Sequence, residues 1–457
     1  MRRAGNVIVA AVAVLMLVGP AWAQTNEQTA PEKKQSLSEG AQIAAEAVVA
    51  YQVDAGSTSS ESAPGQKEEE DPSGFRVFWS DGLRMETNDG KFQVRVGGRI
   101  QYDWDFFGDD SEVKDLVPGP IEDGTEFRRA QIFISGYMYE KVEFKAQWDI
   151  ARNVIKDLYF GYRHPHFGVR FGHTKEPFGL EELTSDKYIT FIERALPTIF
   201  DSSRNSGFLL HGNWDKFGYG VGVFRDTDSS GVGQNEPTLP DTDIGRLSGY
   251  NFTGRVYGLP IKSDDGRRLL HLAFAIRRGP REPSIPTRFR QRPETHLSPY
   301  FISTGNIALE SSTIASIEGA FVYDSFSLQG EYKPSWMTTE DGSNPSYLGW
   351  YLYGSYWLTG EHRAYRNGVF RRVSVNRPFL EGGPGGWEVG ARYSMLDLDS
   401  DAKPADAAIP GSRLDDITVG VNWHWNKMTR MMFNVIHATI DQEASIWTFS
   451  WRGQVEF

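Results

Sequence analysis

The sequence predicts an all-β membrane protein: an antiparallel transmembrane β-barrel of about sixteen strands, preceded by an export signal. Three observations support this fold class. The first residues read as a cleavable signal, the chain from Phe75 onward alternates apolar and polar residues, and long polar connections alternate with tight turns. The 457-residue chain has no cysteine, which suits passage through an oxidising compartment and excludes thiolate metal sites and cysteine nucleophiles.

The N-terminus carries the signal. Arg2 and Arg3 precede an apolar stretch from Val7 to Val18, and Ala21–Ala23 supplies a small-residue cleavage site, so residues 1–23 are predicted to be a signal peptide. The apolar run is shorter than the roughly 20 residues that a membrane-spanning helix needs. Residues 24–74 are rich in Gln, Ser, Ala and Glu, which predicts a disordered or short-helix periplasmic region. A flexible tether is the favoured interpretation of this region, and a trimer-forming helix is the alternative.

Residues 75–457 are predicted to form the barrel. Between Lys91 and Asp105 the odd positions are mostly polar or charged, whereas the even positions are mostly apolar, which is the pattern of a strand with two unlike faces. A soluble sandwich is the alternative, but aromatic residues gather near strand ends and charges continue along the polar face. Long loops are expected near 107–124, 175–205, 227–248, 279–311 and 397–412. About sixteen strands would enclose a water-filled lumen.

Several stretches resemble the phosphate-selective porin O and P family. They are Glu126–Gln131 through Gln147–Asp149, Gly172–Glu182, Phe191–Pro197, Leu358–Glu361 and Gly386–Ser394. The resemblance covers the predicted barrel. It implies a trimeric, sixteen-stranded outer-membrane porin whose third loop folds into the lumen and narrows it. It also implies that Arg and Lys side chains line the path and bind phosphate or polyphosphate.

Basic residues on the predicted lumen face and in loop 175–205 are the candidate anion-binding residues. They are Arg95, Arg99, Arg129, Lys145, Lys175, Lys187, Arg194 and Arg204. Arginine suits phosphate because its planar fork donates two parallel hydrogen bonds and stays charged. Alternatively, lumen acids such as Asp103 and Asp149 neutralise these groups. Loop 175–205 holds four basic and six acidic residues, a net charge of −2, so it is expected to face a basic wall across a transverse field.

Two further basic stretches are expected outside the lumen. By strand parity the 279–311 loop, with Arg288, Arg290 and Arg292, faces the exterior, where it collects anions or binds lipopolysaccharide phosphates. Arg363, Arg366, Arg371, Arg372 and Arg377 lie in a long segment, 360–385, on the periplasmic side of the tight turns. A solvated turn is expected there, and the alternative is that these arginines pass anions on to a binding protein.

These patterns predict a passive outer-membrane channel for small anions, phosphate foremost. Its predicted partners are outer-membrane lipid, lipopolysaccharide and two further copies of the chain. A non-selective diffusion porin of the same fold and a plugged structural or adhesive barrel remain alternatives. The formal net charge of −12 argues against nucleic-acid binding. Neither a nucleophile elbow nor a phosphate-cradling glycine loop is present, and histidines lack zinc-site spacing, so neither an enzyme nor a bound cofactor is expected.

Overall fold

The computed structural model describes residues 74–108, 111–227, 249–400 and 412–457. The predicted signal peptide and residues 24–73 of the predicted N-terminal region lie outside the described residues, as do residues 228–248 and 401–411 of two predicted loops. Residues Val77–Glu86 and Gly90–Phe457 form one compact unit, which contains the barrel. In the part of the chain that the structure describes, no helix combines the length and apolar character needed to cross a membrane.

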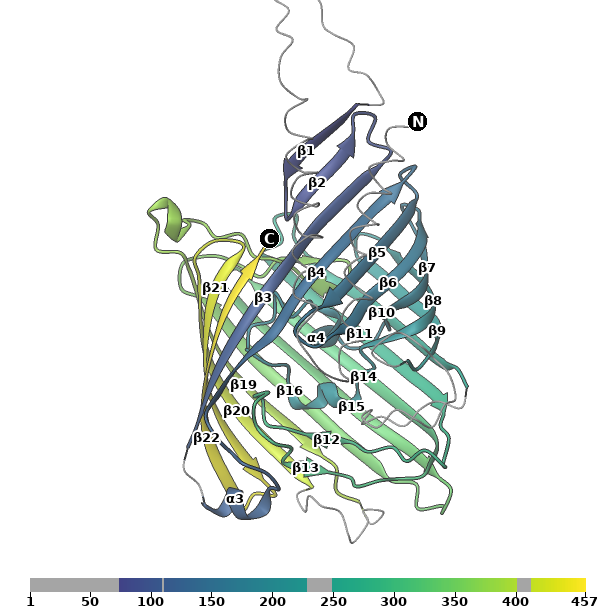
Figure 1. Ribbon diagram of the computed structural model, residues 1–457, viewed down its shortest axis with the longest axis vertical. Coiled ribbons are helices and arrows are strands. Elements are labelled where there is room, and N and C mark those ends of the chain that lie inside the picture. The colour runs from purple at the N-terminus through teal and green to yellow at the C-terminus, as the bar shows by residue number, and fades with distance from the viewer. Residues whose placement is uncertain (1–73, 109–110, 228–248, 401–411) are drawn as a thin grey trace, which may run out of the picture. The chain divides into compact units, whose positions relative to one another are not determined.

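Sixteen antiparallel strands close into a barrel, which confirms the predicted fold class (Figure 1). The last strand pairs with the first to close the ring, from Thr448 opposite Phe107 to Glu456 opposite Arg99. The sixteen strands are β3 Gln93–Phe107, β4 Gly124–Met138, β5 Val142–Asp149, β6 Val154–Arg163, β7 Gly168–Lys175, β8 Arg204–Asn213, β9 Phe217–Arg225, β10 Asn251–Lys262, β11 Arg268–Pro280, β14 Leu309–Tyr323, β15 Phe326–Thr339, β16 Ser346–Trp357, β19 Gly386–Asp397, β20 Arg413–His424, β21 Thr429–Ile440 and β22 Ala444–Glu456. Two short strands precede them, β1 Phe75–Trp79 and β2 Leu83–Thr87, and β2 pairs with β3.

The two-residue alternation of the sequence sets the two faces of each strand. On β3, the side chains of Ile100 and Trp104 are 44% and 45% exposed, whereas Gln101 and Asp103 are at most 2% exposed. Apolar side chains therefore face the lipid and polar ones face the interior of the barrel, as the alternation predicts.

Tight turns join the strands at one end of the barrel, here called the turn side. The turn between β14 and β15 is typical: Asp324 adopts a left-handed conformation (φ 48°) that a two-residue hairpin turn requires. The exception is residues 358–385 between β16 and β19, which contain β17 Tyr365–Arg366, β18 Val369–Phe370 and the 3-10 helix η3 Phe379–Glu381. The other end, the loop side, carries the longer connections, including helix α3 Ser111–Leu116 between β3 and β4.

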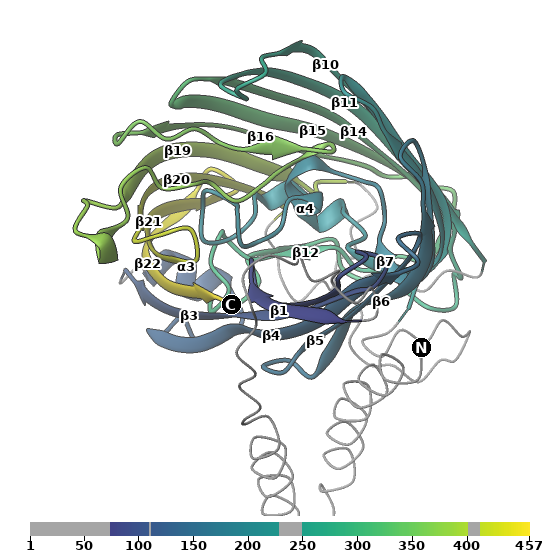
Figure 2. The ribbon, with the colours of Figure 1, turned by 90° about the horizontal axis from the view of Figure 1, so that it is seen from above.

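Two long loop-side connections fold into the barrel (Figure 2). The third connection, residues 176–203, carries α4 Leu180–Leu183 and the 3-10 helix η2 Leu196–Phe200; the fifth, residues 281–308, carries β12 Arg290–Gln291 and β13 Ile302–Ser303. With α3 they build an apolar core inside the loop side, in which Val113, Phe200, Phe289 and Phe301 are buried. This core packs against strands such as β20 and β21, so the open part of the lumen lies along β3–β10.

Candidate functional site

A cavity of about 980 Å³ occupies the open part of the lumen. Its wall comes from β3–β10, the third connection crosses it, and residues 364–372 border it from the turn side. Basic side chains dominate this lining: thirteen Arg and four Lys face five carboxylates, a local net charge of +12 within a chain whose formal charge is −12. A lumen that is basic in an acidic chain attracts anions, because a permeating ion responds to the charges nearest to it.

All eight sequence-predicted candidate residues line this cavity. Seven of them also form ion pairs: Arg99 and Arg129 with Asp186, Lys145 and Arg204 with Asp157, Lys175 and Arg194 with Glu182, and Lys187 with Glu456. Arg95 instead lies over the ring of Phe133, 4.8 Å from its centroid. The sequence left open whether these cations pair with carboxylates, and in the structure most of them do. The partner acids come mainly from the third connection and β6 rather than from Asp103 or Asp149.

Carboxylates of the third connection clamp it to the barrel wall. Asp186 contacts the guanidinium groups of Arg99 and Arg129, the second at 2.6 Å. Glu193 lies 2.7 Å from both Arg128 and Arg452. Burial alone would raise the pKa of Asp186, but the neighbouring Arg99 and Arg129 hold it well below its ordinary value. The Asp186 carboxylate therefore stays ionised, in direct contact with the basic wall.

Two β-bulges add lumen charges that strict alternation does not predict. On β4, the register passes from Arg129 opposite Gln101 to Phe127 opposite Tyr102, so Arg128 is the extra residue. As a result both Arg128 and Arg129 are buried on the lumen side. The second bulge lies where β5 pairs with β6, and both Lys156 and Asp157 line the cavity there. Sequence reasoning missed Arg128 and Lys156; two adjacent charged residues inside an otherwise alternating strand were the available signal.

The prediction of a solvated turn at 360–385 is wrong for residues 361–372, whereas residues 376–384 are mostly exposed. Residues from this segment line the cavity, and the Arg363 side chain is only 4% exposed. Arg363 lies 3.5 Å from the ring centroid of Phe370 and donates a hydrogen bond to Gln329 on β15. Tyr365 bonds to His271 on β11. Stacking and hydrogen bonds to the inner wall thus draw the segment into the lumen, where it supplies Arg366, Arg371 and Arg372 to the cavity.

The prediction that the 279–311 loop faces outside is also wrong for most of its length. Phe289 and Phe301 enter the apolar core, which favours an inward path. Glu294 is buried and forms an ion pair with Arg392 at 2.5 Å, and His296 contacts Glu126 on β4. Arg290 is the first residue of β12 and Arg292 directly follows this strand. The guanidinium carbon of each lies 4.0 Å from the centroid of the Tyr300 ring. These arginines therefore belong to a loop held inside the barrel mouth.

Six cations of the cavity form no ion pair with a carboxylate of the described residues. They are Arg84, Arg95, Arg152, Lys156, Arg366 and Arg371. They come from β2, β3, the β5–β6 connection, β6 and the 358–385 segment. The β5–β6 connection lies on the loop side and the 358–385 segment on the turn side, so these cations are spread along the cavity from one end to the other. Among the residues that the structure describes, no group of three or more His, Cys, Asp or Glu side chains has a metal-binding arrangement. The arrangement offers positive charge to a passing solute.

Comparisons with known proteins agree with this architecture. The chain is 27% identical over 381 residues to an uncharacterised protein of Caulobacter vibrioides, covering 81% of this chain and 72% of that protein. It is 25% identical over 400 residues to Porin O of Pseudomonas aeruginosa, covering 79% and 86%. An anion-selective porin from Comamonas acidovorans shares the fold at 13% identity, with a TM-score of 0.50 and coverage of 80% and 100%.

The family model of phosphate-selective porin O and P matches residues 94–446, nearly the entire barrel. The stretches that carried the resemblance lie within this range. The chain therefore belongs to the phosphate-selective porin O and P family, as a β-barrel channel of the bacterial outer membrane rather than an enzyme.

Proposed function

We propose that this porin is a passive, water-filled channel for small anions, with phosphate or polyphosphate as its main solutes. The observation that carries the proposal is the cavity lining, in which seventeen basic side chains face five carboxylates. The family's description as phosphate-selective supports the same solute.

The lining suits an anion that moves through the channel from one weak binding site to the next. Selective conduction needs sites that attract the ion yet hold it weakly enough to release it. The eight predicted residues Arg95, Arg99, Arg129, Lys145, Lys175, Lys187, Arg194 and Arg204, all on the cavity wall, are proposed as such sites. Arg95, which has no ion-pair partner among the described residues, is the strongest of these. Guanidinium groups match phosphate oxygens in pairs and keep their charge at any physiological pH.

Ion pairing favours one alternative, a non-selective diffusion porin. Seven of the eight candidate cations contact carboxylates, which shortens the reach of their field. Four carboxylates outside the lining, Glu143, Glu193, Glu318 and Glu456, also pair with lining cations. An excess of eight positive charges remains when they are counted, and this excess favours the anion channel. We further propose a homotrimer that contacts lipid and lipopolysaccharide, with the N-terminal region as a periplasmic tether.

Planar-bilayer recordings of the purified protein test the proposal. In a KCl gradient, the reversal potential is expected to show preference for chloride over potassium, and added phosphate is expected to reduce the chloride current. Weak selectivity without phosphate block would support the diffusion porin. A closed barrel without conductance would support the plugged structural role.

A further inference from the structure

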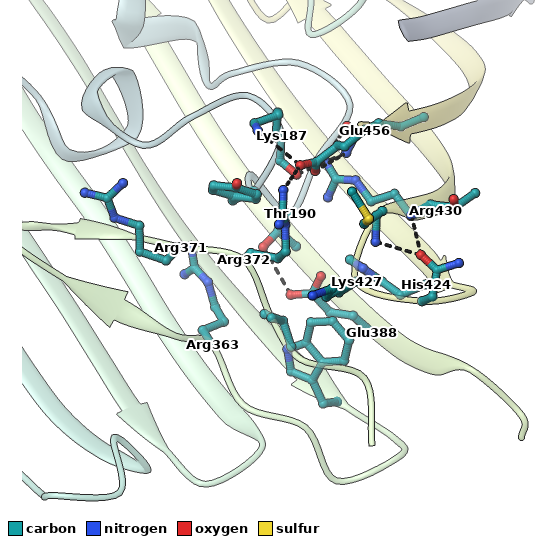
Figure 3. A pocket seen from close by; sticks show the side chains of 17 residues that line it. Lys187, Thr190, Arg363, Arg371, Arg372, Glu388, His424, Lys427, Arg430 and Glu456 are labelled. Carbon is teal, nitrogen blue, oxygen red and sulfur yellow. Dashed lines mark hydrogen bonds and ion pairs between the residues drawn. The ribbon is translucent and has the colours of Figure 1, made fainter. Parts of the chain in front are cut away.

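The connection between β16 and β19 has two halves that lie on opposite sides of the barrel wall. Its first half, residues 361–372, enters the lumen, where Figure 3 shows Arg363, Arg371 and Arg372 lining a small space together with Lys187 of the third connection. Its second half, residues 376–384, is here called the flap. The flap carries η3, the short green helix that projects outward from the barrel at the turn side (Figure 1; Figure 2). The channel function proposed above makes no use of it.

The flap packs against the outer face of β19 and β20. The ring centroid of Phe379 lies 4.9 Å from that of Trp423, and Trp423 in turn stacks on Trp387 at 5.3 Å. Trp423 shares its face of β20 with Ile417 and Val419, because residues separated by two positions in a strand point to the same side. Ile417 and Val419 are both 51% exposed, as befits side chains that meet lipid. The flap is therefore continuous with the lipid-facing surface of the barrel.

Hydrogen bonds fix the conformation of the flap and satisfy its polar backbone. The carbonyl oxygen of Pro384 accepts hydrogen bonds from the indole N–H groups of Trp387 and Trp423, each at 3.1 Å. Pro378 and Pro384 have no N–H group to donate. Other backbone N–H groups donate to carbonyl oxygens of the chain; they are those of Phe379, Glu381, Gly382, Gly383 and Gly385. A backbone whose donors are satisfied within the protein can enter an apolar medium without a large desolvation penalty.

The tip of the flap is apolar and exposed. Leu380 is 69% exposed and Phe379 is 42% exposed. In water, a fold gains nothing by holding two large apolar side chains away from other residues, because apolar surface is stabilised by burial. Arg377 and Glu381 lie on either side of this pair and are exposed as well. An apolar tip that is flanked by charges and backed by tryptophans is typical of a segment at the boundary between lipid headgroups and acyl chains.

We propose that the flap inserts into the periplasmic leaflet of the outer membrane and binds phospholipid there. The turn side faces the periplasm, as the short turns of bacterial outer-membrane barrels do. Leu380 and Phe379 contact the acyl chains just below the headgroups, and Arg377 and Glu381 extend toward the headgroups. A connecting segment makes this contact, whereas the other lipid contacts of the barrel come from its strands. Because the first half of the same segment carries lumen arginines, the lipid gives that segment a fixed point outside the lumen.

Spin labelling of the full-length protein in vesicles of phosphatidylethanolamine and phosphatidylglycerol tests this proposal. The chain has no cysteine, so Leu380→Cys provides a single attachment site for a nitroxide. Collisions with dissolved oxygen report contact of the nitroxide with acyl chains, and collisions with a water-soluble nickel complex report contact with water. Ile417→Cys is the matched control for lipid, and Asp264→Cys, in the exposed turn between β10 and β11, is the control for water. We expect oxygen collisions to exceed nickel collisions at positions 380 and 417, and the order to reverse at position 264.

Two outcomes overturn the proposal. A label at position 380 that collides mainly with the nickel complex shows that the tip lies in water. A label that is shielded from both reagents shows that a second copy of the chain or another protein covers the flap. If the labelled Leu380→Cys protein fails to fold, Glu381→Cys gives a second position at the tip, where fewer nickel collisions than at position 264 are expected. The measurement needs no ion current, so its failure is distinguishable from a failure of the proposed anion channel.

Discussion

Arg95 offers the clearest test of how lumen charge sets selectivity. Its guanidinium lines the main cavity, stacks on Phe133 and forms no ion pair within the described part of the chain. Replacing it with Gln therefore removes one positive charge without leaving a buried carboxylate unpaired, and folding should be preserved. Arg95→Lys keeps the charge and removes the planar fork, so it serves as the matched control.

The magnitude follows from Coulomb's law. An ion that passes about 6 Å from the guanidinium in water gains or loses about 0.7 kcal/mol. Removal of the charge penalises chloride and favours potassium by this amount, so their permeability ratio falls about tenfold in dilute salt. Screening at 0.15 M, where the Debye length is about 8 Å, reduces the fall to about threefold.

The assay is the reversal potential in a planar bilayer under a KCl gradient, measured at low and at high mean salt. We expect Arg95→Gln to lower chloride preference in a salt-dependent way and Arg95→Lys to retain it. An unchanged ratio for Arg95→Gln in dilute salt would refute the reasoning, because it would mean that permeating ions do not pass this wall. An equal fall for Arg95→Lys would show that the guanidinium shape, and not its charge, sets the selectivity.

Three further predictions concern the inserted segments. Asp186→Asn removes the carboxylate shared by Arg99 and Arg129, so we expect a lower unfolding temperature and noisier single-channel currents; quiet currents would show that Asp186 does not anchor the loop. Burial, with help from Arg128, lowers the pKa of His296, so its stabilising neutral form is present above pH about 6.5 and is lost as the pH falls through the lowered pKa. Proteolysis of residues 281–308 should accordingly accelerate upon acidification, and His296→Gln should remove this dependence. Replacing residues 364–371 with a short Gly-Ser linker should raise conductance and lower chloride preference, because the segment borders the cavity and carries Arg366 and Arg371; an unchanged conductance would place the narrowest point elsewhere.

The sequence predicted the barrel because its strands obey a local rule. Alternation with a period of two places Arg99 and Asp103 on the lumen face and Ile100 on the lipid face, and the structure follows it. The rule fails where the backbone breaks register. At the bulges, Arg128 joins Arg129 and Lys156 joins Asp157 in the cavity, which a count of odd and even positions cannot reproduce.

The inserted segments were harder to predict because their paths depend on distant partners. The 358–385 segment is basic and contains turn-forming residues, a composition that suits a solvated turn equally well. The segment turns inward because Arg363 stacks on the Phe370 ring and donates a hydrogen bond to Gln329, and because Tyr365 is hydrogen-bonded to His271. Likewise the buried Glu294 forms an ion pair with Arg392, nearly a hundred residues later in the chain. Such pairings have no local signature in the sequence.

The position of the loop acids decides how the lumen field is shaped. A net charge of −2 on residues 175–205 suggested a transverse field, which requires water between an acidic loop and a basic wall. The structure places the carboxylates of Asp186 and Glu193 in contact with wall arginines, at 2.6 and 2.7 Å for Arg129 and Arg128. Opposite charges at contact distance form short dipoles whose field decays quickly, so these acids mainly anchor the loop. The field that a solute meets then comes from the surplus cations, Arg95 and Lys156 among them, and this favours anions along the whole cavity rather than across it.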